Sequence, residues 1–187
     1  MADELPLTLI LSSGLVGALV AVSYLVVLFD NAGLFPLPSA AGTSFFSSPY
    51  WLGMPSDTVT VLVLLQMLAA IGALLWFIWL VTTPEKQFEN TILSTETNRI
   101  FILQLFLWSS TAWPFTAYLY LNEKSTTNAV LACTPLWLAA VAVALMIGAT
   151  FESNAPPVAL LAALFLGLVV VLCDGVGWAF LCFRNSV

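Results

Sequence analysis

The sequence predicts an all-α integral membrane protein, a single multi-pass domain over residues 1–187 with a bundle of about five transmembrane helices. Hydrophobic residues make up 61% of the chain and charged residues only 7%, whereas soluble domains carry about 25% charged residues. Several apolar runs reach the roughly 20 residues that a membrane span needs. Backbone groups in lipid must be satisfied within a segment, and barrel-like alternation is not evident, so we expect these runs to be α-helices.

The first span is expected at residues 7–29. A secretory signal would begin with positive charges and have a short apolar core, whereas this run is long and follows Asp3 and Glu4. We therefore interpret it as a retained span. The other four spans are expected at 59–81, 100–121, 128–149 and 158–183. Short turns join the last three, which predicts that these helices are antiparallel neighbours.

Small residues cluster in the first, second and fourth spans, with Gly14, Gly72 and Gly148 among them. Small residues let helix backbones approach each other closely in a membrane, where lipid offers no hydrophobic drive between helices. The pattern therefore predicts close helix packing. The alternative is that alanine and glycine are simply common in membrane helices.

The connection between the first two spans, residues 30–57, is long and contains no Lys or Arg. Four aromatic residues stand close together in it: Phe45, Phe46, Tyr50 and Trp51. Aromatic side chains favour the headgroup layer of a membrane. We therefore expect this loop to lie along the membrane surface or against a partner protein.

The connection between the second and third spans is expected to form a short surface helix. Thr83 is placed to cap it and Pro84 suits its first turn. One face of this helix is expected to hold Phe88, Ile92 and Leu93. A second cap, at Ser94 or Thr95, then precedes the third span.

The orientation of the bundle does not follow from its charges. We call the end that holds the N-terminus of the first span X and the opposite end Y. Lys86 and Arg99 are expected at X, and Lys124 and Arg184 at Y. The positive-inside rule needs an excess on one side, and here each side has two. The long first loop, which lacks positive charge, favours Y as the non-cytoplasmic side.

A layer of polar residues is predicted in the Y half of the bundle. Asp174 stands inside the most apolar span, roughly 14 Å from its Y end at the rise of an α-helix. Gln66, Ser23, Ser110 and Thr134 fall at comparable depths, within a layer about two helical turns thick. We expect these side chains to form a hydrogen-bonded cluster.

Asp174 has two interpretations. A charged Asp at the centre of a bilayer costs about 2.5 to 3.5 kcal/mol, and lipid disfavours the charged form of a carboxyl group. Without a Lys, Arg or His in the spans to pair with, Asp174 is expected to be protonated and to hold helices together as a hydrogen-bond donor. The alternative is a carboxylate that binds a proton or a substrate.

Several classes of chemistry are excluded by the composition. The chain has no His, which excludes His-ligated haem and chlorophyll, His-based metal sites and a Ser-His-Asp triad. The three cysteines include no C-x-x-C pair, so no metal site is indicated. Neither a nucleotide-binding glycine motif nor a basic patch for nucleic acid is present. We therefore expect no enzyme activity, no catalytic residue and no cofactor other than bound lipid.

The function expected from these features is that of a non-catalytic structural or accessory subunit of a larger membrane assembly. Respiratory, photosynthetic, translocation and viral-envelope complexes all fit. Its expected partners are the lipid bilayer, in a membrane that the sequence does not identify, and other membrane subunits. The alternative is a small oligomeric transporter or channel that uses Asp174.

Overall fold

The computed structural model describes residues 7–28 and 48–186, apart from the side chains of residues 25–28, and these residues form helices and turns only. Four uninterrupted helices run the length of a bundle: α1 (Leu7–Leu28), α2 (Ser56–Thr82), α3 (Glu96–Asn122) and α4 (Thr126–Glu152). A fifth helical segment covers Pro157–Arg184. All five are long and apolar enough to cross a membrane. The five expected helices are thus present, with boundaries within about four residues of the expected ones.

The fifth segment changes its helical geometry along its length. It begins as α5 (Pro157–Gly167), continues as the π-helix η4 (Leu168–Trp178) and ends as α6 (Ala179–Arg184). A π-helix bonds each residue to the fifth one along, is rare, and is frequently found at functional sites. Asp174 lies within η4.

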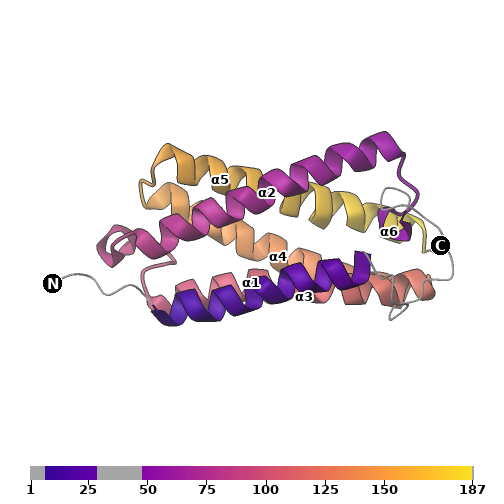
Figure 1. Ribbon diagram of the computed structural model, residues 1–187, viewed down its shortest axis with the longest axis horizontal. Helices are drawn as coiled ribbons and strands as arrows, with labels where there is room; N and C mark the ends of the chain where they lie inside the picture. Colours follow the sequence, from indigo (N-terminus) through magenta and orange to yellow (C-terminus); the bar gives the residue numbers. More distant parts are fainter. Residues whose placement is uncertain (1–6, 29–47, 187) are drawn as a thin grey trace.

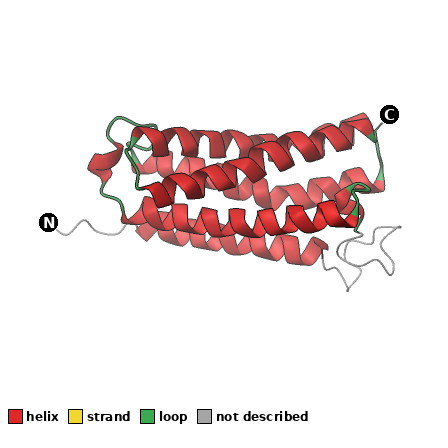
Figure 2. Ribbon diagram, turned by 90° about the horizontal axis from the view of Figure 1, so that it is seen from above, coloured by secondary structure: helices red, strands yellow, loops and turns green. Residues whose placement is uncertain are grey.

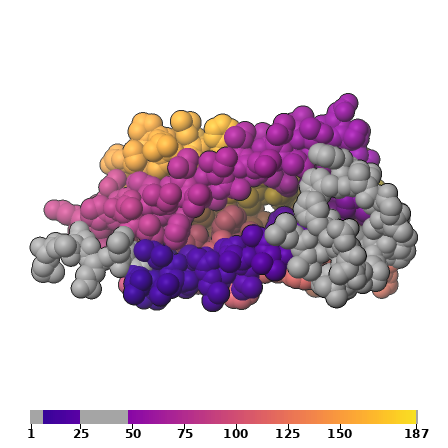
Figure 3. Space-filling view, in the orientation of Figure 1, coloured from indigo at the N-terminus to yellow at the C-terminus, as the bar shows by residue number. Residues whose placement is uncertain are grey.

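The helices lie side by side along the long axis, with α1 and α3 on one edge, α2 and α5 on the other and α4 between them (Figures 1 and 2). Extensive contacts join α1 to α3, α3 to α4, α4 to α5 and η4, and α5 to α2. The expected antiparallel grouping of the last three segments is therefore confirmed. Among the described residues the row does not close with an extensive α1–α2 contact. The surface is hollowed between these two helices (Figure 3); we call this region the α1–α2 seam.

The X half of the bundle is a continuous apolar core. Buried side chains from α2, α3, α4 and α5 pack together there, among them Trp76, Leu80, Ile102 and Val143. The Trp76 indole N–H donates a hydrogen bond of 2.8 Å to the Thr150 hydroxyl, so this buried donor is satisfied.

The connection at the X end differs in part from the expected surface helix. Only Glu85–Phe88 (η3) is helical, as a 3₁₀ turn that follows Pro84 without a side-chain cap, so the expected cap by Thr83 is wrong. Phe88 is fully buried, but Ile92 is exposed, because the chain turns after η3 and does not keep a helical face.

The start of α3 is secured by a capping residue and a buried cation. Thr95 caps the helix and accepts a hydrogen bond from the Asn98 amide, as one of the two expected caps. Arg99 is only 2% exposed, pairs with Glu85 and lies 5.4 Å over the Phe88 ring. The guanidinium therefore ties the connection to α3.

Candidate functional site

Asp174 stands on the π-helix at a point where the backbone comes close to α4. The next residue, Gly175, accepts a 3.0 Å hydrogen bond at its carbonyl from the Trp137 indole on α4. A Cβ at Gly175 would lie 3.2 Å from the Val170 carbonyl oxygen and 3.4 Å from the Ala140 Cβ. Glycine here therefore permits the close approach of η4 and α4 beside the carboxyl group.

Two side chains from the ends of the helix row meet Asp174. The Gln66 side chain on α2 lies within hydrogen-bonding reach of the Asp174 carboxyl group. Tyr24 on α1 lies close enough for electrostatic contact with the same group. Since α1 and α2 do not pack extensively against each other, the three side chains converge on the α1–α2 seam. Asp174 and Gln66 are the two members of the predicted cluster that the structure brings together.

An aromatic cluster adjoins this site in the Y half. The Trp113 ring centroid lies 5.6 Å from that of Tyr24, 5.5 Å from that of Trp178 and 6.4 Å from that of Tyr50. The Trp178 indole donates a 2.9 Å hydrogen bond to the Tyr50 carbonyl. Trp113 is buried, and its indole N–H has no hydrogen-bond partner among the described residues.

The three hydroxyl residues of the predicted layer do not join Asp174. Ser110 and Thr134 donate hydrogen bonds to carbonyls one turn earlier in their own helices, at 2.9 and 2.8 Å. Ser23 does the same within α1, at 2.8 Å. A hydroxyl in a helix reaches such a carbonyl without help from a neighbouring helix. Thr134 also faces the outside of the bundle.

The aromatic residues of the first loop divide into two groups. Phe45 and Phe46 lie outside the described residues. Tyr50 and Trp51, in the short helix η2 (Pro49–Trp51), are buried in the chain's own bundle. The Tyr50 hydroxyl donates a 3.3 Å hydrogen bond to the Pro114 carbonyl on α3. These two side chains therefore anchor the loop to the Y end.

Sequence reasoning missed Tyr24 and Trp113. Tyr24 follows Ser23 directly, so its place in the polar layer was readable from the sequence. Trp113 gave no such signal, because seven tryptophans occur in the chain and only the packing shows which indole lies beside Tyr24. The π-helix was equally hidden.

The site combines one carboxyl, one amide and one phenol. Within the described part of the chain, no group of three His, Cys, Asp or Glu side chains is placed to hold a metal ion. The arrangement can hold a proton, or hydrogen-bond a polar group that enters the seam.

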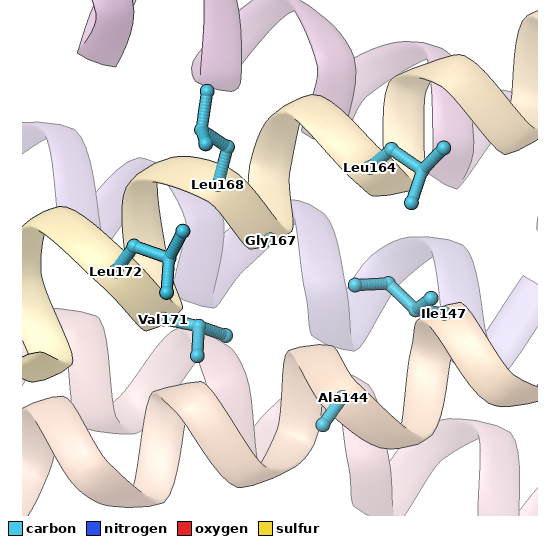
Figure 4. Close-up of a pocket in the computed structure, with 7 residues that line it drawn as sticks. All are labelled: Ala144, Ile147, Leu164, Gly167, Leu168, Val171 and Leu172. Atoms are coloured by element: carbon cyan, nitrogen blue, oxygen red, sulfur yellow. The ribbon is translucent and has the colours of Figure 1, made fainter.

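A separate groove lies on the outside of the bundle between α4 and the α5–η4 segment. It encloses about 440 Å³, and every side chain along it is apolar (Figure 4). Its lining residues are Ala144, Ile147, Leu164, Gly167, Leu168, Val171 and Leu172. No polar side chain lines the groove to orient a ligand, so its chemistry suits a hydrocarbon chain.

Comparison of the chain with protein-family models, curated proteins and solved structures finds no match.

Proposed function

We propose that this chain is an integral membrane protein that acts as a non-catalytic accessory subunit, with a partner helix docked at the α1–α2 seam. The observation that carries the proposal is the open helix row. α1 packs mainly on α3, and α2 packs mainly on α5. Among the described residues no extensive contact joins α1 to α2. The apolar length of all five helices supports the membrane location.

The surface of α1 supports a helix as the partner. Gly14 and Ala18, four residues apart, are both exposed, and a Cβ at Gly14 would meet nothing within 4 Å. Small residues at this spacing allow close helix–helix contact in membranes. Asp174 and Gln66 add a polar contact deeper in the seam, and the outer apolar groove is suited to a lipid chain.

Native purification tests the proposal. The tagged full-length protein is extracted in mild detergent, and co-purifying proteins are quantified by mass spectrometry. A fixed-stoichiometry partner is expected with the wild type and should be lost with Gly14→Leu. Gly148→Leu is the matched control, because Gly148 is also exposed on a helix with nothing within 4 Å of its would-be Cβ. A protein that purifies alone, with no partner, refutes the accessory role.

A second candidate function, a small oligomeric transporter or channel, is favoured by the placement of Asp174 on a π-helix beside Gln66 and Tyr24. Reconstitution into liposomes that contain a pH-sensitive dye tests it. Proton flux is expected from the wild type and from Glu152→Gln, a change at the exposed X end of α4. Asp174→Asn should abolish the flux. Absence of flux in the wild type counts against this candidate.

A further inference from the structure

Two cysteines at the Y end take no part in the Asp174 site. Cys133 on α4 and Cys182 on α6 are both fully buried, in the same cluster as Tyr120 and Trp178. Both are free thiols, and they lie close enough to each other to interact. The third cysteine, Cys173, lies on η4, is only partly buried and neighbours Asp174.

Independent contacts hold α4 and α6 in the register that joins these thiols. Trp137, one turn after Cys133, stacks on Phe183, the residue after Cys182, with centroids 6.2 Å apart and planes 12° apart. Because residues four apart share a helix face, this stack directs the Cys133 face of α4 toward α6.

Hydrogen bonds fix the position of Cys182 further. Its carbonyl accepts a 2.8 Å hydrogen bond from the Tyr120 hydroxyl on α3 and a 2.7 Å one from the Ser186 hydroxyl. The Tyr120 side chain belongs to the same buried cluster as both cysteines. The pairing therefore belongs to a packed three-helix contact and does not depend on one side-chain rotamer.

We propose that Cys133 and Cys182 form an oxidisable dithiol, which closes to a disulfide between α4 and α6 when it transfers two electrons to a lipid-soluble quinone. One thiol adds to the oxidant, and the second sulfur displaces it as the S–S bond forms. Both thiol S–H bonds break, and the two protons and two electrons pass to the quinone, which becomes a quinol. This redox role is independent of the accessory function.

The burial of both thiols sets the class of oxidant. Neither side chain reaches water, and the cluster around them is largely apolar, so a neutral quinone enters it more readily than a charged oxidant does. α6 is six residues long and lies at the end of the fifth helical segment, so a small local movement can admit the oxidant. A disulfide needs its sulfurs about 2.05 Å apart, so the two thiols must approach each other further as the bond forms.

Counting free thiols tests the pairing in the full-length protein. The folded protein in mild detergent is treated with diamide, a neutral two-electron thiol oxidant, then denatured and labelled with a polymer-linked maleimide that shifts gel mobility once per free thiol. Three shifts are expected before oxidation and one afterwards, from Cys173. A digest without reductant should yield the peptide that links Cys133 to Cys182.

Matched variants separate the pair from the third cysteine. Cys173→Ala should show two shifts before oxidation and none afterwards, whereas Cys133→Ala and Cys182→Ala should keep two throughout. Tryptophan fluorescence verifies that each variant is folded. Three shifts that persist in the oxidised wild type, or linked peptides that contain Cys173, overturn the pairing.

The oxidant is tested by replacing diamide with a short-chain quinone. One quinol is expected per disulfide formed, read from the loss of quinone absorbance. A quinone that leaves the thiols free, under conditions in which diamide closes the bond, overturns the quinone assignment.

Discussion

Replacement of Gly72 by alanine should weaken the attachment of α2 to the bundle. α2 is held mainly by α5, and a Cβ at Gly72 would lie 2.9 Å from the Ala162 carbonyl oxygen and 3.6 Å from its Cα. Favourable contacts between carbon atoms lie at about 3.5 to 4.0 Å, so 2.9 Å from a carbonyl oxygen is a clash. The atom in the way belongs to the backbone and cannot rotate aside, so the two helices must separate.

The magnitude follows from two opposing terms. Forcing an extra methyl group into a packed contact costs about 1 to 3 kcal/mol. Alanine in place of glycine in a helix gains about 0.8 to 1.0 kcal/mol. Gly148→Ala provides the second term alone, because nothing lies within 4 Å of its would-be Cβ. The difference in free energy of unfolding between the two variants should therefore be about 1 to 3 kcal/mol, with Gly72→Ala the less stable.

Reversible unfolding in mixed detergent and SDS micelles, followed by circular dichroism, measures this difference. Gly167→Ala is an intermediate case, because its Cβ would meet the end of the flexible Ile147 side chain and not backbone. Its stability should fall between those of the other two variants. If Gly72→Ala is as stable as Gly148→Ala, the close α2–α5 contact does not hold α2 in place and the reasoning fails.

Three further predictions concern polar contacts, and each is measured by the same unfolding assay. Thr150→Val removes the acceptor of the buried Trp76 indole N–H and should cost about 1 to 3 kcal/mol, whereas Thr150→Ser keeps the hydroxyl and should cost less. Glu85→Gln removes the charge that faces Arg99, which is 2% exposed while Glu85 is 73% exposed. The free energy of unfolding should fall by about 1 to 3 kcal/mol, between the values for exposed and buried pairs, and by less at high salt. Asp174→Asn keeps a hydrogen-bonding group opposite Gln66 and should change the free energy of unfolding by less than about 0.6 kcal/mol, whereas Asp174→Leu should cost more.

The helices were predictable because their signal lies in length and composition. A run of apolar residues long enough to span a membrane must satisfy its backbone internally, whatever its neighbours are. The caps follow local chemistry in the same way, as Thr95 shows. Short turns then fixed which of the later helices are neighbours.

The rotation of each helix about its axis was not predictable. A helix that is apolar on all sides has no polar face to indicate which side packs inward, so the depth of Thr134 was readable but its outward direction was not. The burial of Arg99 was not predictable either, because it depends on the pairing with Glu85 and the contact with Phe88 that only the folded chain brings together. The π-helix depends on backbone geometry that sequence periodicity does not register.

The energetics of Asp174 favour a role beyond holding the bundle together. Within the proposed membrane, a charged carboxyl costs about 2.5 to 3.5 kcal/mol, whereas an interhelical hydrogen bond contributes only about 0.6 kcal/mol on average. Protonation lowers the cost but leaves a polar group that one amide satisfies only in part. A second hydrogen bond, from a partner helix or a ligand in the α1–α2 seam, would offset the remaining cost. The Trp113 indole N–H, which has no partner among the described residues, lies nearby beside Tyr24. Both candidate functions therefore include a polar contact at Asp174. The flux experiment tests that contact directly, whereas the purification experiment tests the partner surface on α1.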